Sequence, residues 1–302
     1  MKNWILLSRL PFLSVVILPY ILGALLAQRF AGRFSLVVFL LGLLGSILIQ
    51  LSAHYSGEIY DTKEDRLSAI SGKSPFNGGS QILVKNLIPE NKVKILVYAV
   101  VLLALVTGII LQFYLKTGKW TLLLGASGMI CGLFYSKPPL RWVSRGLGEI
   151  FIAYSFGFLA VNAGFYIQAS RFDILALFIS LPIACAVVNI ILINEYPDYQ
   201  ADKEAGKENL LVRIGKEKGA FIYTLLVVCA GVSFFLALTK GLPAGSAFFY
   251  LPVLIVAVIL ASLMLRGAYK DRLLLERMCA MTILVNLGTS LSCIFGLLIS
   301  KA

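Results

Sequence analysis

A series of long apolar runs restricts the folds open to this sequence more than any other feature. Each run approaches the roughly 20 residues that a helix needs to cross a hydrocarbon core of about 30 Å, and charges are almost absent from the middle of the runs. We therefore predict membrane-spanning helices. The runs lie near residues 10–28, 35–56, 93–115, 120–136, 146–168, 172–196, 219–239, 246–265 and 278–299.

The composition supports this interpretation. Of the 302 residues, 59% are hydrophobic and 14% are charged, and the mean hydropathy is +0.88. Soluble domains carry charges on about a quarter of their residues. We expect an all-α, multi-pass membrane protein in which residues 1–302 form a single domain, a bundle of nine transmembrane helices with a cytoplasmic polar cap. Lys2 and Arg9 precede the first run as they would in a secretory signal, but eight further runs favour a retained helix.

The net charge of +12 would fit nucleic-acid binding, but the charges are distributed as in a membrane protein. Lys and Arg in short loops usually mark the cytoplasmic side. In the nine-helix arrangement most of the 27 Lys and Arg residues fall on the side of the amino terminus, and of the 15 acidic residues Asp173 alone maps to the other side. We therefore expect a protein of the cell membrane, with the lipid bilayer as a partner, no nucleic acid, and an active site facing the cytoplasm.

Two acidic triplets with the same spacing lie where the second and sixth runs end. In each triplet the later carboxylates follow the first by three and seven residues, so a helix would present all three within an arc of about 60°. Like charges this close repel, and Mg²⁺ relieves the repulsion through carboxylate oxygens and substrate phosphates. The alternative, two solvated acidic helix ends, leaves the repeated spacing unexplained. The triplets are Glu58, Asp61 and Asp65, and Glu195, Asp198 and Asp202.

Basic, glycine-containing connections follow both triplets, at residues 62–91 and 203–219. Each could cover an anion held near the carboxylates, although ordinary membrane-surface loops look similar. The loop from Tyr135 to Arg141 adds two hydroxyls and two cations on the same predicted side. Pro197 lacks a backbone N–H and clashes with the carbonyl one turn before it, so we expect the sixth helix to kink or end there.

These features resemble the UbiA superfamily of intramembrane prenyltransferases over the whole chain. That family has nine spans with acidic motifs after the second and sixth. Its first motif, N-x-x-x-D-x-x-D-x-x-x-D, is met here by His54, Glu58, Asp61 and Asp65, with departures at the first two positions. Its second motif is met by Asn194, Asp198 and Asp202. Residues 202–215 resemble the family's D-x-x-x-G-K-x-T-L-x-V-R-x-G segment.

The resemblance implies that the two motifs hold Mg²⁺, which bridges the diphosphate of a polyprenyl donor whose tail lies between the helices. The implied metal ligands are Glu58, Asp61, Asp65, Asn194, Glu195, Asp198 and Asp202. The implied catalytic residues are Glu58, Asp61, Asp65, Asp198 and Asp202. The implied diphosphate-binding residues are Arg9, Lys73, Tyr135, Ser136, Lys137, Arg141, Lys203 and Lys207. His54 is a further candidate, either as a metal ligand or acceptor base or as a replacement for Asn that bonds a helix neighbour.

The physical chemistry agrees with transfer from an allylic diphosphate, because cations neutralise the charge of that leaving group. The resemblance extends to the branch that prenylates dihydroxynaphthoate in menaquinone synthesis, so we expect Mg²⁺-dependent transfer of a polyprenyl group to an aromatic acceptor of this kind. Alternative acceptors are 4-hydroxybenzoate, homogentisate and a lipid alcohol. The alternative of another class is a transporter, but transporters carry charges within their spans, whereas the acids here lie at one rim.

Overall fold

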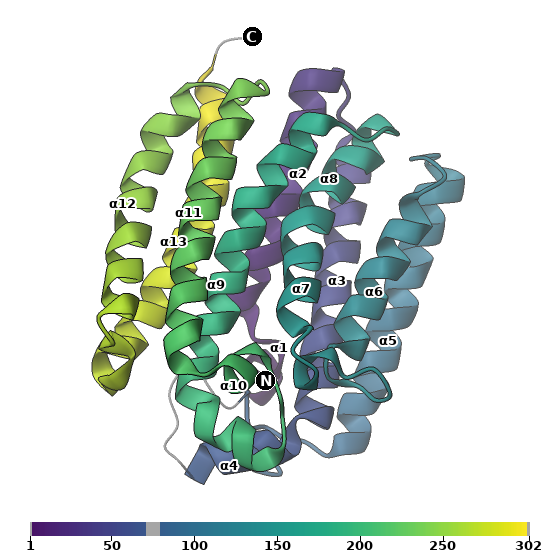
Figure 1. The fold of residues 1–302 in the computed structure, drawn as a ribbon. Helices are drawn as coiled ribbons and strands as arrows, with labels where there is room; N and C mark the ends of the chain where they lie inside the picture. Colours follow the sequence, from purple (N-terminus) through teal and green to yellow (C-terminus); the bar gives the residue numbers. More distant parts are fainter. Residues whose placement is uncertain (1, 71–78, 301–302) are drawn as a thin grey trace.

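The computed structural model describes residues 2–70 and 79–300, and within these ranges every regular element is helical (Figure 1). Lys73 lies outside the described residues. In chain order the elements are α1 (Lys2–Ser8), η1 (Leu10–Leu13), α2 (Ser14–Ala31), α3 (Leu36–Tyr60), α4 (Thr62–Ile70), α5 (Glu90–Ile109), η2 (Ile110–Tyr114), α6 (Thr121–Ser136), η3 (Trp142–Ser144), α7 (Gly148–Ile152), η4 (Ala153–Leu159), α8 (Ala160–Ala169), α9 (Ile174–Ala205), α10 (Leu210–Ile214), α11 (Lys216–Thr239), α12 (Gly245–Leu265), η5 (Ala268–Lys270) and α13 (Arg272–Ile299).

All nine apolar runs correspond to helices. In the described part of the chain, eight helical segments are long and apolar enough to cross a membrane by length and composition. The ninth run forms α6, which is apolar but has 16 residues. One segment, Gly148–Ala169, combines α7, the π-helical η4 and α8. The structure therefore confirms an all-α, multi-pass membrane protein.

The helices form one bundle in which sequence neighbours and distant helices both meet. Helix α2 packs against α8 and α13, α3 packs against α5 and α6, and α9 packs against α11 and α13. Small residues allow the closest of these approaches. A Cβ atom at Gly23 of α2 would lie 2.0 Å from the Val161 carbonyl oxygen, and one at Gly164 of α8 would lie 2.3 Å from the Tyr20 carbonyl oxygen. The backbones of α2 and α8 therefore touch.

The two acidic motifs differ in their helical structure, and the first of them does not lie on one helix as expected. Helix α3 ends at Tyr60 and the short helix α4 begins at Thr62, so Asp65 does not lie on the same helix as Glu58. The Thr62 hydroxyl donates to the carbonyl of Ile59 (2.8 Å) at this break. In contrast, α9 continues past Pro197 to Ala205. Of the two outcomes expected at Pro197, a kink or an end, the end is therefore wrong, and the predicted boundary at residue 196 is nine residues short.

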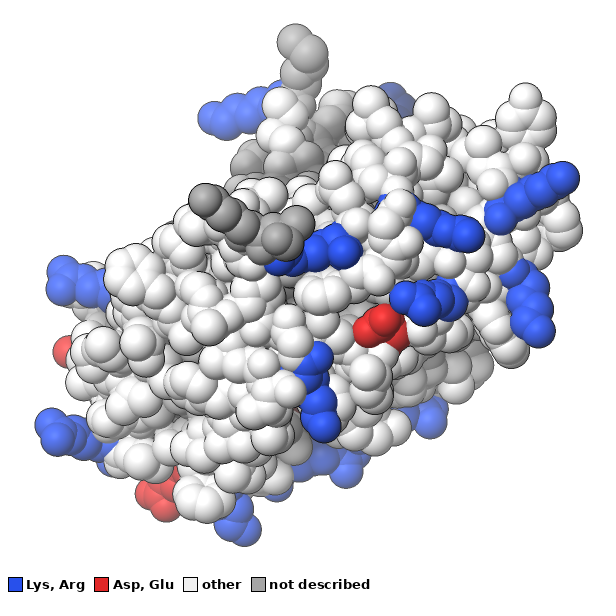
Figure 2. Space-filling view, turned by 90° about the horizontal axis from the view of Figure 1, so that it is seen from above, with Lys and Arg blue, Asp and Glu red and all other residues white. Residues whose placement is uncertain are grey.

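The ends of the bundle differ in character. Helices α4 and α10 lie together at one end, at the bottom of Figure 1, and we call this the polar end. There the Lys63 Nζ atom of α4 donates to the Ala205 carbonyl oxygen at the end of α9 (2.8 Å). Figure 2 views the opposite end, which is mostly uncharged with scattered Lys and Arg side chains. Acidic side chains are sparse on this face, in agreement with the mapping of the acids to one side.

Candidate active site

A single face of α3 runs along a cavity of about 380 Å³. The lining positions recur at alternating steps of three and one residues, which is the pattern of one helix face. On α3 they are Gly42, Gly45, Ser46, Ile49, Gln50, Ala53, His54, Gly57 and Glu58, and Asp61 follows as the residue that caps the helix. Helix α6 contributes a similar face, and residues of η1, α2, α4, α5, η2, α7, η4, α8 and α9 also line the cavity.

The cavity has a polar head and a long apolar body. From the capping residue Asp61 down to Gly42 of α3, head and body together extend about 28 Å at 1.5 Å per residue, close to the roughly 30 Å thickness of a hydrocarbon core. The head, at the polar end, is lined by both acidic motifs. The body is lined by apolar and small residues, including Ala104, Leu111 and Leu124. Such a cavity fits an amphiphile with a charged head and a long apolar tail.

The first motif places two buried carboxylates at the head. The Ser136 hydroxyl of α6 donates to Asp61 Oδ2 (2.5 Å), which joins two residues that the sequence analysis assigned to metal and diphosphate. Burial raises the pKa of Asp61, although Lys207 lies nearby. Burial, together with the carboxylates of Asp61 and Glu58, raises the pKa of Asp65 to about 8. Both shifts mean that the negative charge here is held at a cost, which a bound cation would remove.

The second motif faces the first across the cavity head. Asp202 is 2% exposed, and its carboxylate accepts from Asn209 Nδ2 (2.8 Å) and lies 3.3 Å from Lys207 Nζ. Ser68 of α4 donates to Asp198 Oδ1 (2.5 Å). Burial opposes the charge of Lys207, but the carboxylates of Asp202 and Asp61 together raise its pKa well above the usual value. Lys207 is therefore a resident cation between the two motifs.

Glu58 and Glu195 differ from the four aspartates because backbone groups occupy their oxygens. Glu58 Oε1 accepts from the N–H groups of Ile82 (2.6 Å) and Leu83 (3.1 Å), and Oε2 accepts from that of Ser80 (3.1 Å). Glu195 Oε2 accepts from the Leu211 N–H at the start of α10 (3.3 Å). Both carboxylates line the cavity, and each also anchors a segment that covers the polar end.

The predicted basic and hydroxyl residues fall into two groups. Arg9, Tyr135, Ser136 and Lys207 line the cavity, as does the predicted metal ligand Asn194. Arg141 pairs with Glu64 and lies 3.6 Å from Asp61 Oδ1. Lys203 is exposed, and the Lys137 ammonium lies over the Phe134 ring, so neither lines the cavity.

His54 lines the cavity, but both of its ring nitrogens face groups of the protein itself. Nδ1 lies 3.0 Å from the Ser8 carbonyl oxygen, and Nε2 lies 3.4 Å from Gln50 Nε2. This arrangement agrees with the second hypothesis for His54, in which the side chain replaces Asn and hydrogen-bonds a neighbour on its own helix.

Two polar residues of the head were not identified from the sequence. Glu64 is 3% exposed, lines the cavity and binds Arg141, and Ser68 bonds Asp198. Both lie on α4, where the break after Tyr60 changes the helical phase. The pattern Asp61-Thr62-Lys63-Glu64 matches the D-x-x-E signature of a helix start, and it could have indicated this second helix.

The donor atoms at the head fit a hard divalent cation. Among the described residues no three carboxylate, His or Cys side chains already lie close enough together to hold a metal. However, the available donors are oxygens, as Mg²⁺ prefers. In the described part of the protein, Asp61 Oδ1 and Glu64 Oε2 are buried without a hydrogen-bond donor.

This fold and this cavity are those of a multi-pass membrane protein with an internal cavity that has a polar head and an apolar body. The chain belongs to the UbiA prenyltransferase family, whose family model matches residues 16–285, and it is therefore a prenyltransferase. It is 29% identical over 228 residues to the 1,4-dihydroxy-2-naphthoate octaprenyltransferase of Bacillus subtilis, covering 76% of this chain and 70% of that one. It is 27% identical over 228 residues to the 2-carboxy-1,4-naphthoquinone phytyltransferase of Synechocystis, covering 75% and 71%.

Solved structures share the fold at lower identity. A UbiA homologue from Aeropyrum pernix superposes with a TM-score of 0.70 at 17% identity, covering 95% of this chain and 97% of that one. A UbiA homologue from Archaeoglobus fulgidus bound to GPP and Mg²⁺ gives a TM-score of 0.65 at 18% identity, covering 97% and 99%. These likenesses confirm the bundle architecture.

Proposed function

We propose that this protein transfers a polyprenyl group from an allylic diphosphate to an aromatic quinone precursor, with 1,4-dihydroxy-2-naphthoate as the first choice, in a Mg²⁺-dependent reaction. One observation carries the proposal: a single cavity joins the two acidic motifs to a long apolar body, and head and body together extend about as far as a hydrocarbon core is thick. A donor with a diphosphate head and a long isoprenoid tail matches both parts of this cavity.

The aspartates at the cavity head are the residues that would hold Mg²⁺. They are Asp61, Asp65, Asp198 and Asp202. When bound, Mg²⁺ supplies the positive charge that stabilises a departing diphosphate. The homologue from Archaeoglobus fulgidus that was solved with GPP and Mg²⁺ supports this ligand class. Glu58 and Glu195 would act mainly by holding the covering segments, because their oxygens already accept backbone N–H groups.

Other side chains would bind and orient the diphosphate. Lys207 lies between the two motifs, and Arg9 lines the same head. Their positive charges favour a leaving diphosphate, since electrostatic stabilisation in a buried site is stronger than in water. The Ser136 hydroxyl orients Asp61 (2.5 Å). The apolar walls below exclude water, which would otherwise capture an allylic cation.

Aromatic faces along the cavity would shield the developing allylic cation. Tyr135, Phe151 and Phe156 line it. Phe151 is held in place by the Trp142 ring, whose centroid lies 3.6 Å away in a stacked arrangement. An aromatic face attracts a cation by about 0.5 to 2 kcal/mol. The same surfaces also suit a flat aromatic acceptor.

The acceptor assignment rests on charge and on relatives. Arg141 and Arg145 lie in the connection between α6 and α7, and Arg145 is fixed by donating to the Pro139 carbonyl oxygen (2.7 Å). A basic rim favours a carboxylated aromatic by electrostatic attraction. The similarity to naphthoate and naphthoquinone prenyltransferases supports a naphthoate ring. We also propose that the polar end faces the cytoplasm across the cell membrane, because most Lys and Arg residues map to that side.

An acceptor panel tests the proposal. Purified protein receives Mg²⁺, a long-chain allylic diphosphate and, in separate reactions, dihydroxynaphthoate, 4-hydroxybenzoate, homogentisate or a glyceryl phosphate lipid. We expect a prenylated product with dihydroxynaphthoate that disappears when EDTA removes the metal. Product with only one of the other acceptors would move the assignment to that acceptor. Absence of diphosphate release with every acceptor would contradict a transferase of this kind.

A further inference from the structure

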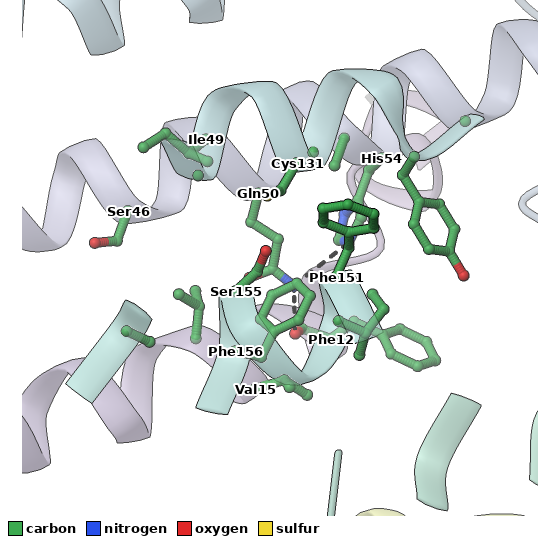
Figure 3. Close-up of a pocket in the computed structure, with 18 of the residues that line it drawn as sticks. Phe12, Val15, Ser46, Ile49, Gln50, His54, Cys131, Phe151, Ser155 and Phe156 are labelled. Carbon is green, nitrogen blue, oxygen red and sulfur yellow. Dashed lines mark hydrogen bonds between the residues drawn. The ribbon is translucent and has the colours of Figure 1, made fainter. Parts of the chain in front are cut away.

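The side-chain amide of Gln50 is buried in the wall of the cavity, in the part shown in Figure 3. The residue is 4% exposed. Its Nε2 atom lies 2.8 Å from the carbonyl oxygen of Phe12, which can only accept a hydrogen bond. The amide orientation is therefore fixed by chemistry, with the nitrogen toward Phe12. Position 50 lies on the lining face of α3 one turn before His54.

His54 uses the second N–H of this amide. Its Nδ1 atom lies 3.0 Å from the Ser8 carbonyl oxygen, so Nδ1 carries the proton and donates it there. Nε2 is then an acceptor, and it lies 3.4 Å from Gln50 Nε2. The two N–H groups of Gln50 are thus directed to Phe12 and His54. Within the described residues, Gln50 Oε1 is buried and has no hydrogen-bond donor.

The surroundings of Gln50 are mostly aromatic and apolar, with the Ser155 side chain as a further polar group near the amide. Figure 3 shows the rings of Phe151 and Phe156 near the amide, and Val15 and Ile49 farther along the wall of the same cavity. A buried carbonyl without a donor is unfavourable, so a ligand that supplies a hydroxyl at this point gains affinity. Aromatic walls accept a flat ring through offset or edge-to-face contacts. The arrangement therefore fits a hydroxylated aromatic ring.

The chemistry of the two substrates decides which of them this oxygen binds. The isoprenoid tail of the donor has no polar hydrogen, and the ionised diphosphate offers lone pairs that a carbonyl oxygen repels. Of the two, a phenolic acceptor alone presents an O–H group. We propose that Gln50 Oε1 accepts a hydrogen bond from a ring hydroxyl of the aromatic acceptor, and that His54 is a positioning residue that aims this oxygen. This inference rests on the proposed function.

Unreactive acceptor analogues test the contact without relying on turnover. The inhibition constants of 1-hydroxy-2-naphthoate and 2-naphthoate, which differ by one hydroxyl, are measured in competition with dihydroxynaphthoate. In the unsubstituted enzyme we expect the hydroxylated analogue to bind about tenfold more tightly. In Gln50→Leu we expect the ratio to fall to about one, while the KM for the allylic diphosphate changes less than twofold. Gln50→Met provides a second variant with an unbranched side chain of similar length.

Ser46→Ala is the matched control. Ser46 lies one turn away on the same lining face, but its hydroxyl is satisfied by the Gly42 carbonyl oxygen (2.9 Å). We expect this variant to keep the tenfold ratio. A ratio of one in the unsubstituted enzyme, or an undiminished ratio in folded Gln50→Leu or Gln50→Met, overturns the inference while leaving prenyl transfer intact. Failure of the unsubstituted enzyme to prenylate any aromatic acceptor would instead remove the proposed function. If the acceptor panel selects another ring, that ring and its deoxy analogue are compared.

Discussion

The hydroxyl of Ser68 donates to Asp198 Oδ1 across 2.5 Å, and it joins helix α4 directly to the second acidic motif on α9. The two residues are 130 positions apart in the chain. This contact fixes the short helix that carries Glu64 and Asp65 against the long helix that carries Asp198 and Asp202. Contacts within the protein therefore align the two motifs.

Loss of charge in the second motif should abolish most of the activity. Asn keeps the size of Asp but removes its charge, so Asp198→Asn and Asp202→Asn should each lower kcat/KM more than tenfold with retained folding, because a hard cation needs carboxylate oxygens. Glu204→Gln, an exposed position on the same helix, should remain within twofold. Circular dichroism checks folding. Near-normal turnover in both aspartate variants would remove the metal assignment.

Glu58 should act through the segment that it holds. Glu58→Gln removes the charge that accepts three backbone N–H groups, and hydrogen bonds to a charged group contribute about 1.5 to 3 kcal/mol each. The backbone amides of Ile82 and Leu83 should then exchange with deuterium at least tenfold faster, as measured by mass spectrometry of a proteolytic peptide that contains both residues. If exchange is unchanged and Mg²⁺ affinity falls a hundredfold, Glu58 is a direct metal ligand instead.

The two predicted diphosphate-binding lysines near the end of α9 should behave differently. Lys207 lies in the cavity beside Asp202, whereas Lys203 is exposed. Lys207→Gln should raise the KM for the allylic diphosphate at least tenfold, since it removes a buried cation from the head. Lys203→Gln is the matched control and should change it less than twofold. Equal effects of the two substitutions would show that the diphosphate is bound outside the cavity head.

The apolar body of the cavity should set the donor length. Gly125 lines the cavity, and a Cβ atom there would meet no atom within 4 Å. Gly125→Leu should therefore fold normally and shift the preference, measured as kcat/KM over a series of allylic diphosphates, toward shorter tails by at least fivefold. Gly245→Leu is the matched control, because a Cβ atom there also meets no atom within 4 Å but Gly245 does not line the cavity. This variant should not alter the preference for donor length. An unchanged length profile in Gly125→Leu would place the tail elsewhere.

The orientation in the membrane can be tested by labelling. In a background without the five native cysteines, Lys203→Cys should react with an impermeant maleimide only from the cytoplasmic side, and Lys240→Cys only from outside, because both lysines are exposed and lie at opposite ends of the bundle. Gel-shift detection in intact cells and inverted vesicles measures this. The reverse pattern would overturn the charge-based topology and the cytoplasmic placement of the site.

The sequence predicted the helices well because each apolar run has a single solution in a membrane. Their ends were less accurate where polar residues take over. The +3 and +7 spacing suggested one helix for Glu58, Asp61 and Asp65, but the chain breaks after Tyr60, and Glu64 consequently enters the cavity. Periodicity alone cannot indicate such a change of phase.

The different roles of the glutamates and the aspartates could not be predicted from sequence patterns either. Glu58 binds a segment more than 20 residues away in the chain, as its contact with Ile82 shows, and only the tertiary fold brings these groups together. The free oxygen of Gln50 depends on contacts with Phe12 and His54. No spacing rule describes an atom that lacks a partner.

The unbroken lining face of α3 also limits how this protein can evolve. Gly42 at one end and Asp61 at the other share one helical register. Insertion or deletion of one residue between them would rotate one end by about 100° relative to the other and turn either the head or the tail wall into the lipid. Substitutions along α3 can therefore change which substrate tail or head group the cavity accepts. Changes in the length of α3 must instead come in whole helical repeats, so that both ends of the lining face keep their direction.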